Sequence, residues 1–329
     1  MKVCFVSSLF KMDDICGPSI FVRNISPFLK NKGIEVSFNP NETCDILFTL
    51  ITAPIEIVLR AKGKGARVIQ RLDGVFFDKT KDYKGMNLKL KATQDEADLV
   101  IYQSNFAKEM CQHYLGIPQR FRIIYNPVDT AVFTPYGKKM DFEGINLLAV
   151  STWRPWKRLQ DSVEAVKELL RIRNDIVFTI IGRGVNIEGA SSHIKYLGEL
   201  PHDSLPAYYR SSQVFLYPSY LDWCPNVVLE ALSSGTPVIC TDTGGTPELV
   251  GNGGIIIKTG EVFDYEPKDL YNLEAIPKVD PEEFVAAINL ILESKREYSW
   301  RARRRARGFS LEVIGNQYLE VLREVLDGG

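Results

Sequence analysis

The chain has 329 residues, a formal net charge of −1, 45% hydrophobic residues and 25% charged residues. This composition is typical of a globular protein and excludes a disordered chain. The length predicts about two domains, because a single hydrophobic core seldom serves more than about 250–300 residues. The longest apolar runs are far shorter than the roughly 20 residues that a membrane-spanning helix needs.

The amino-terminal residues and the cysteines favour a cytoplasmic protein. Lys2 is followed directly by a strand-like apolar run without a small-residue cleavage site, so we expect no signal peptide. The six cysteines include no Cys-x-x-Cys pair, which indicates neither a zinc site nor a disulfide framework. We therefore expect reduced thiols and no structural metal.

Short apolar strands alternate with helical patterns in the first half of the chain. The strands expected are Lys2–Ser8, Ile34–Phe38, Asp45–Leu50, Arg67–Arg71, Leu99–Gln103 and Arg122–Tyr125. The helices expected are Ile20–Lys30, Ile55–Lys62, Leu88–Ala97 and Asn105–Tyr114. Such alternation predicts parallel βαβ units with helices on both faces of a sheet.

The alternation pauses between about 126 and 144, where Pro and Gly indicate a linker, and then restarts. The strands expected after it are Ile145–Val150, Ile176–Ile181, Ile194–Leu197, Val214–Tyr217, Val238–Thr241 and Ile255–Ile257. The helices expected are Leu159–Ile172, Asp203–Arg210, Asn226–Ser233, Pro281–Leu292, Lys295–Arg307 and Leu311–Leu326. The acidic, Pro-containing stretch Glu261–Asp280 is expected to be a surface loop.

These patterns predict an α/β protein of two doubly wound, Rossmann-like domains that face each other across a cleft. The first covers residues 1–135 and the second residues 145–309, and a last helix at 310–329 is expected to pack back on the first domain. Ligands of such sheets bind at the carboxyl ends of the strands, and a cleft is a common place for a small-molecule site.

The most informative stretch is Tyr217–Val250, YPSYLDWCPNVVLEALSSGTPVICTDTGGTPELV. Pro225 fits the first turn of a helix, and Gly235 fits its end. The helix N-terminus would present backbone amides to an anion or to sugar hydroxyls. Glu230 follows one turn into that helix and could accept hydrogen bonds from the vicinal hydroxyls of a ribose. On physical grounds alone, Asp222 could equally be a helix cap and Glu230 a surface residue.

This stretch resembles the signature of the group 1 (family 4) retaining glycosyltransferases. The shared order is a strand, Pro-Ser, an acid, seven residues, Glu-Ala-Leu and then Ser-Gly-Thr-Pro-Val. The other segments that resemble the family are Gly17-Pro18, Gln103–Phe106, Asn126–Asp129, Trp153–Arg158, Ile181–Gly184, Tyr196–Gly198, Gly244–Glu248 and Gly308–Ser310. The resemblance covers nearly the whole chain, is strongest over 145–260, and implies the GT-B fold.

The resemblance also implies two substrates. A nucleotide-sugar donor would bind the second domain, and a glycan, glycolipid or other sugar acceptor, lipid-linked or not, would bind the first. In the donor site, Glu230 would hold the ribose. Asp222, together with the backbone near Trp223, Cys224 and Asn226, would hold the transferred sugar.

The remaining roles concern the diphosphate and the base. Lys157, with Arg154, would neutralise the diphosphate, and Gly17 would let the backbone approach it; Arg183 and Leu200 lie where the family contacts the base. Charge leaves with the diphosphate when the sugar–phosphate bond breaks, and fixed cations stabilise that state by several kcal/mol. Because no Asp-x-Asp motif is present, we expect no metal and no cofactor. Retention of configuration is implied by the family.

Three departures from the family pattern stand out. Asp222 replaces a usual glutamate, Ser151-Thr152 replace a usual Gly-Arg, and Gln70–Gly74 lacks a usual histidine. Asp73 lies at that place and could face the reacting sugar or the acceptor, or could simply form an Asp-Gly turn.

The three histidines His113, His193 and His202 are interpreted as surface residues without a role. These departures leave a non-catalytic GT-B scaffold that binds sugar or a partner as the alternative function. A nicotinamide oxidoreductase is disfavoured, because Ser7-Ser8-Leu9 replaces a Gly-x-Gly-x-x-Gly turn.

Charge is distributed unevenly. Residues 1–140 carry 20 Lys and Arg against 14 Asp and Glu, a net of +6, and residues 141–329 carry 20 against 27, a net of −7. The basic clusters Arg60–Arg67 and Lys79–Lys91 could attract an anionic acceptor or membrane face, or could be a solvated surface. The five arginines of Arg301–Arg307 are expected to pair with acidic residues of the second half. No sequence motif favours nucleic-acid binding.

Overall fold

The computed structural model describes residues 1–9, 17–185, 191–260 and 262–328. Its contacts divide the chain into two compact units. The first unit comprises Met1–Pro127, Tyr265–Lys268 and Phe309–Gly329, and the second comprises Val128–Asp264 and Asp269–Gly308. The linker expected at 126–144 therefore counts mostly with the second unit, where the buried Phe133 ring packs against His202 and Tyr209.

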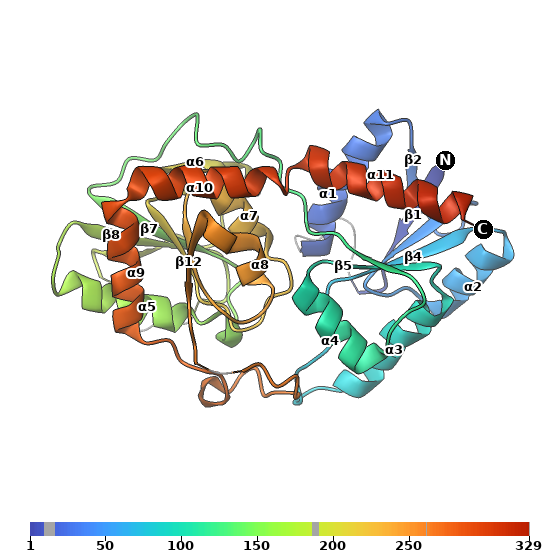
Figure 1. The fold of residues 1–329 in the computed structure, drawn as a ribbon, viewed down its shortest axis with the longest axis horizontal. Helices are drawn as coiled ribbons and strands as arrows, with labels where there is room; N and C mark the ends of the chain where they lie inside the picture. Colours follow the sequence, from blue (N-terminus) through green and yellow to red (C-terminus); the bar gives the residue numbers. More distant parts are fainter. Residues whose placement is uncertain (10–16, 186–190, 261, 329) are drawn as a thin grey trace. The chain divides into compact units, whose positions relative to one another are not determined.

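The first unit is a six-stranded parallel sheet in the order β2-β1-β3-β4-β5-β6, with helices around it (Figure 1). The strands are β1 (Lys2–Val6), β2 (Glu35–Ser37), β3 (Ile46–Leu50), β4 (Arg67–Leu72), β5 (Leu99–Tyr102) and β6 (Phe121–Ile123). The helices are α1 (Gly17–Asn31), α2 (Ile55–Gly63), α3 (Tyr83–Glu96), α4 (Asn105–Leu115) and α11 (Leu311–Asp327). β3, β4 and β5 are buried almost throughout, as the mainly apolar sequences of β3 and β5 predict; in β4 the polar side chains of Gln70 and Arg71 are buried as well.

Helix α11 packs beside α1, although about 280 residues separate them in sequence (Figure 1). Its apolar face, including Ile314, Tyr318 and Leu322, lies in one hydrophobic cluster with Phe21 and Ile25 of α1. Gly315 permits this close approach, because a Cβ there would lie 2.5 Å from the Phe28 ring. The last helix is thus part of the core of the first unit.

The second unit is also a six-stranded parallel sheet, in the order β12-β11-β10-β7-β8-β9. The strands are β7 (Ile145–Val150), β8 (Ile176–Ile181), β9 (Ile194–Tyr196), β10 (Val214–Tyr217), β11 (Val238–Thr241) and β12 (Gly254–Ile257). The helices are α5 (Leu159–Leu170), α6 (Leu205–Ser211), α7 (Asn226–Ser233), α8 (Thr246–Val250), α9 (Pro281–Glu293) and α10 (Lys295–Arg307). The chain moves outward from β7 to β9 and then returns to the other side of β7, so the winding reverses between β7 and β10.

Several expectations differ from the structure. α3 begins at Tyr83, five residues before the expected start, because Asp82 caps it by accepting a hydrogen bond from the Gly85 amide. α8 was not expected as a helix. Glu261 lies outside the described residues, and the rest of the expected surface loop Glu261–Asp280 is only partly at the surface, because Leu270, Ile276 and Val279 are buried.

Candidate functional site

The second sheet has its topological switch point between β7 and β10, which are adjacent and parallel. In open α/β sheets, ligands bind beyond the carboxyl ends of the strands at such a point. The segment after β7 carries Lys157 in a short 3₁₀ helix, Pro155–Lys157, and the segment after β10 carries Asp222. The chain topology thus brings two predicted site residues, 65 positions apart, to one place.

Lys157, Asp222 and Tyr217 contact one another there. The Lys157 ammonium forms an ion pair with Asp222 Oδ2 and donates a hydrogen bond of 2.7 Å to Tyr217 Oη. Tyr217 Oη in turn donates to Asp222 Oδ2 at 2.6 Å. Burial, and then the negative charge of Asp222, raise the pKa of Tyr217 well above its ordinary value, so its hydroxyl keeps the proton that it donates. The lysine and aspartate side chains remain 14% and 15% exposed, so a ligand can reach both.

The backbone around Asp222 is fixed by the glycine pair that precedes α8. The Gly245 amide donates to the Asp222 carbonyl at 2.7 Å. Gly244 has a φ of +71°, and a Cβ there would lie 3.0 Å from the same carbonyl oxygen, so this position favours glycine sterically and conformationally. The Trp223 amide donates to Asp222 Oδ1 at 2.9 Å, which orients the carboxylate.

The segment from Ser151 to Arg158 is held against the loop after β8. A Cβ at Gly182, where φ is +122°, would lie only 1.7 Å from the Ser151 carbonyl oxygen, so the two backbones touch. Trp153 donates through its indole to the Ile181 carbonyl at 3.0 Å. Arg154 is exposed and lies over the Trp156 ring at 5.6 Å, and Arg183 is also exposed. Arg154 and Arg183, both predicted to contact the donor, are thus at the surface and accessible to a ligand.

Glu230 lies in α7 and is 96% buried. Tyr209 Oη donates to its Oε2 at 3.0 Å, and His202 Nε2 lies 2.8 Å from its Oε1. A carboxylate accepts about four hydrogen bonds, so these two partners orient the group and leave acceptor capacity for a ligand. The interpretation of Glu230 as a simple surface residue is wrong. The side chain of His202, interpreted as a surface residue without a role, is 43% exposed and also lies against Glu230.

The N-terminus of α7 is built as the sequence predicts, with one difference. Pro225 occupies the N-cap position, one residue before the helix, and no side chain caps the helix. Cys224 is buried, while Trp223 and Asn226 are half-buried. Gly235, with a φ of +76°, ends the helix as expected. Leu200 is half-buried in the segment before α6.

The other two predicted site residues belong to the first unit. Gly17 is the first residue of α1, and a Cβ there would meet no atom of the described residues within 4 Å, apart from its chain neighbours and its own helix backbone. Asp73 follows the carboxyl end of β4. It is ion-paired with Arg71, hydrogen-bonded to Gln103, and 17% exposed. The interpretation of Asp73 as only a turn residue is therefore incomplete.

Arg71 is a functional candidate that sequence reasoning missed. Its guanidinium is almost fully buried, lies 4.0 Å from the centre of the Phe21 ring, and donates to Tyr318 Oη at 3.2 Å and to the Asn126 carboxamide oxygen. The available signal was an arginine inside a buried strand, Arg67–Leu72, since buried charges require partners. Tyr217 was missed in the same way, as a hydroxyl at the end of a buried strand.

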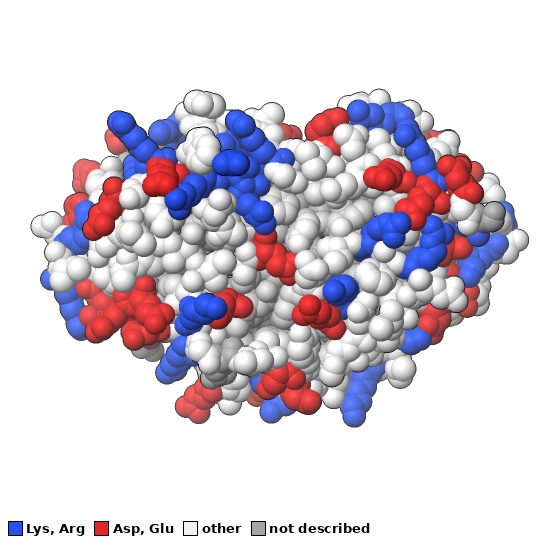
Figure 2. Space-filling model, in the orientation of Figure 1, with Lys and Arg blue, Asp and Glu red and all other residues white. Residues whose placement is uncertain are grey.

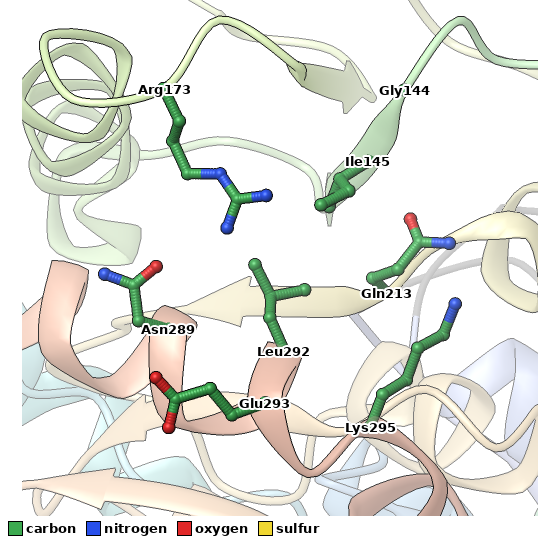
Figure 3. Close-up of a pocket in the computed structure, with 8 residues that line it drawn as sticks. All are labelled: Gly144, Ile145, Arg173, Gln213, Asn289, Leu292, Glu293 and Lys295. Carbon is green, nitrogen blue, oxygen red and sulfur yellow. The ribbon is translucent and has the colours of Figure 1, made fainter.

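One cavity lies away from these residues. Its volume is about 510 Å³, and its lining comes from the amino-terminal side of the second sheet and the end of α9 (Figure 3). None of the predicted site residues lines it. In the close-up, Lys295 points toward Gln213, while Glu293 points away from both (Figure 3). Because strands of this fold present ligands at their carboxyl ends, the Lys157–Asp222 region remains the candidate site.

Two features are absent from the described residues. No helix among them is long and apolar enough to cross a membrane. No group of three or more His, Cys, Asp or Glu side chains among them is placed to hold a metal ion.

Comparison with known proteins identifies a family match in the second unit. The model of the family described as glycosyl transferases group 1 matches residues 144–294, which include Lys157, Asp222 and Glu230. The second unit is a group 1 glycosyltransferase domain. The resemblance seen in the sequence motifs is thereby confirmed.

Two relatives match about two thirds of the chain. The O-antigen chain mannosyltransferase B of Escherichia coli is 26% identical over 251 residues, which is 68% of this chain and 58% of the relative. A D-inositol 3-phosphate glycosyltransferase of Corynebacterium efficiens is 27% identical over 262 residues, 71% of this chain and 59% of the relative. The chain thus spans less than two thirds of the length of either relative.

Solved structures establish the fold over the whole chain. HepE of Anabaena, crystallised with UDP, superposes with a TM-score of 0.71 at 15% identity and covers 98% of this chain and all of its own. Sucrose-phosphate synthase of Thermosynechococcus elongatus superposes with a TM-score of 0.77 at 15% identity, with full coverage of both chains. The predicted α/β class and the GT-B fold are confirmed.

Proposed function

We propose that the protein is a glycosyltransferase that moves a sugar from a nucleotide-sugar donor to a glycan, glycolipid or polysaccharide acceptor, with retention of configuration and without a metal. The observation that carries the proposal is the group of Lys157, Tyr217 and Asp222 at the switch point of a group 1 glycosyltransferase domain. The names of the relatives support transfer of a sugar, and the UDP bound to HepE supports a nucleotide donor.

In this proposal, the ion pair between Lys157 and Asp222 is exchanged for contacts with the donor. Asp222 accepts hydrogen bonds from hydroxyls of the transferred sugar, and Lys157 turns to the diphosphate together with Arg154. Tyr217 stays protonated and keeps Asp222 in place during the exchange. Fixed cations beside the diphosphate stabilise the charge that develops as the sugar leaves, an effect worth several kcal/mol. The cations supply this charge in place of a metal.

Glu230 binds the donor ribose, with its carboxylate oriented by Tyr209 and His202. A carboxylate held by two donors loses little freedom when it accepts further hydrogen bonds, so the contact is favourable. The amides of Trp223, Cys224 and Asn226 contact the sugar, Gly17 allows close approach of the first unit's backbone to the diphosphate, and Arg183 and Leu200 border the base.

The first unit binds the acceptor in this proposal, and Asp73 faces the acceptor or the reacting sugar. Arg71 orients Asp73 and opposes the burial that raises the pKa of this carboxyl, and Arg71 is itself held by Tyr318 and Asn126. We place the protein in the cytoplasm, with peripheral contact to the membrane if its acceptor is lipid-linked.

A thermal-shift screen with UDP, GDP and ADP tests the donor site. A ligand present at 100 times its dissociation constant raises the free energy of unfolding by about 2.7 kcal/mol. We expect one of the three nucleotides to raise the melting temperature and the matching nucleotide sugar to be hydrolysed slowly. A protein that none of them stabilises would contradict the proposed donor site.

The alternative is a non-catalytic GT-B scaffold, which the absence of the usual histidine beside Asp73 favours. A scaffold would bind the nucleotide sugar without breaking it. Transfer or hydrolysis of any nucleotide sugar by the pure protein excludes this alternative, provided that the Lys157→Met variant lacks the same activity.

A further inference from the structure

The arginines of α10 fall into two groups, and the first group is used internally. Arg303 donates to the backbone carbonyls of Thr130, Phe133 and Ser233, and Arg305 donates to those of Glu248 and Leu249. These two residues anchor the helix through carbonyl oxygens, whereas Arg301 pairs with the acidic Glu297 of the second half, as expected.

The second group faces outward. Arg296, Arg304 and Arg307 are exposed, and none forms an ion pair or hydrogen bond within the described parts of the chain. With Trp300 they follow a spacing of four, four and three residues, which places them on one face of the helix. Glu297 interrupts this charge but is itself paired with Arg301. Figure 2 shows Lys and Arg side chains gathered over α10.

Aromatic side chains accompany the arginines. Trp300 is 60% exposed and lies under the Arg304 guanidinium at 5.1 Å. Tyr136 is 80% exposed; burial, and then the charge of Arg307, lower the pKa of Arg303, while Tyr136 acts on that pKa in the opposite direction. Trp and Tyr have an apolar body and a polar edge, and they favour the boundary between lipid and water. An exposed indole among arginines therefore fits a lipid surface better than bulk water.

Several basic residues of the first unit are neutralised by neighbours, although Lys79, Lys84 and Lys89 form no ion pair within the described parts of the chain. Lys62 pairs with Glu96, Lys81 with Asp78, and Lys91 with Asp95. The outward arginines of α10 have no such carboxylate partners among the described residues, so α10 retains more of its positive charge for a partner.

From this geometry we propose that the outer face of α10, formed by Arg296, Trp300, Arg304 and Arg307 with Tyr136 beside it, docks on an anionic lipid bilayer. The arginines attract the acidic headgroups, and the two aromatic rings enter the boundary between headgroups and acyl chains. This surface belongs to the second unit, not to the lysine cluster of the first, and its binding requires no catalytic activity.

The test is sedimentation of the intact protein with vesicles of phosphatidylcholine alone and of phosphatidylcholine mixed with phosphatidylglycerol. We expect binding only to the mixed vesicles, weakening with added salt because the attraction is screened. The variant R296Q/R304Q/R307Q should bind about 100-fold more weakly, since each basic residue near the surface contributes about fivefold. Trp300 emission should shift to the blue on binding, and the shift should vanish in W300F.

Matched variants separate this face from general charge and from misfolding. Arg171 is also in the second unit and its side chain is 74% exposed, so R171Q should leave vesicle binding unchanged. The altered side chains are at the surface, and unchanged thermal unfolding will establish that each variant is folded. K79Q/K81Q/K84Q tests the rival surface on the first unit and should retain vesicle binding.

Three results would overturn the proposal. One is full binding by R296Q/R304Q/R307Q, and another is loss of binding in K79Q/K81Q/K84Q alone, which would assign the membrane surface to the first unit. The third is binding of a soluble polyanion such as heparin without binding of anionic vesicles, which would make α10 a polyanion site.

Discussion

Each unit places a cation–aspartate pair where its sheet presents the carboxyl ends of strands, and the two pairs differ in how they are held. Arg71 in the first unit is 1% exposed and has Asp73, Asn126, Tyr318 and the Phe21 ring as partners. Lys157 in the second unit is 14% exposed and is held by Asp222 and Tyr217.

The difference indicates which pair is able to change partners. An arginine with planar, multiple contacts inside a core is fixed, because each lost contact would leave a buried charge unsatisfied. A lysine is a single charge on a flexible stem, and a partly exposed one can exchange a carboxylate for a phosphate at low cost. We therefore interpret Arg71–Asp73 as a fixed pair and Lys157–Asp222 as an exchangeable one.

The largest expected effect follows from breaking the fixed pair. Arg71→Met should lower the free energy of unfolding by about 3–5 kcal/mol, the usual result of leaving a buried partner charge without its mate. Urea unfolding followed by circular dichroism measures this. The double variant R71M/D73N should regain part of the lost stability, because no unpaired carboxylate remains. An R71M variant as stable as the wild type would contradict the fixed pair.

Breaking the exchangeable pair should act mainly on catalysis. Lys157→Met should lower kcat about 10²–10³-fold, as removal of one preorganised charge-stabilising group does, and should change stability less than Arg71→Met, because Asp222 keeps Tyr217 and the Trp223 amide. Transfer or hydrolysis rates with saturating donor check this. Equal kcat in the variant would remove Lys157 from the mechanism.

Glu230 sharpens the comparison, because it is buried like Arg71 but is proposed to meet a ligand. Glu230→Ala should weaken nucleotide binding by about 1.5–3 kcal/mol, the range for hydrogen bonds to charged groups. Isothermal titration with the preferred nucleotide measures this, and the 2′-deoxynucleotide serves as control, since it should lose little further affinity in the variant. Unchanged affinity in a folded variant would refute the ribose contact.

The net charge of +6 on residues 1–140 leads to a smaller effect. If the acceptor is anionic, K79A/K81A/K84A should raise its apparent Michaelis constant, most at low salt, because the attraction is screened over about 8 Å at physiological salt. The donor constant should not change. Acceptor kinetics unaffected at low salt would make these lysines a solvated surface only.

Chelation should have no effect. If Lys157 and Arg154 supply the charge that a metal supplies elsewhere, activity should survive EDTA unchanged. Activity lost on chelation and restored by magnesium or manganese would show instead that the lysine does not replace a metal.

Much of the fold could be predicted from the sequence because local pattern and burial agree. β7, β8, β10 and β11 have the bounds expected from their apolar runs, since strands buried on both faces contain little else. α8 was missed because five residues are too few to show a helical period. The start of α3 was misplaced because Asp82 and Gly85, which cap it, were not recognised as a cap.

The site was predictable where a motif names the residue, and not where a long-range partner defines it. Lys157, Asp222 and Glu230 lie in segments that resemble a family, although their roles remain predictions. Their partners Tyr217, Tyr209 and His202 are ordinary residues in the sequence, and only the folded chain brings them to the carboxylates. Arg71 likewise finds Tyr318 across 247 positions, a distance that no local pattern spans.

The contact of α11 with α1 has a consequence for biosynthesis. The core of the first unit includes Tyr318 and Leu322, which leave the ribosome only after the entire second unit has been made. At 5–20 residues per second, that delay is on the order of ten seconds or more. During this time the α1 side chains Phe21 and Ile25 are not yet packed against α11, and Arg71 lacks its hydrogen bond to Tyr318. The nascent first unit is therefore the part of the chain most in need of a chaperone.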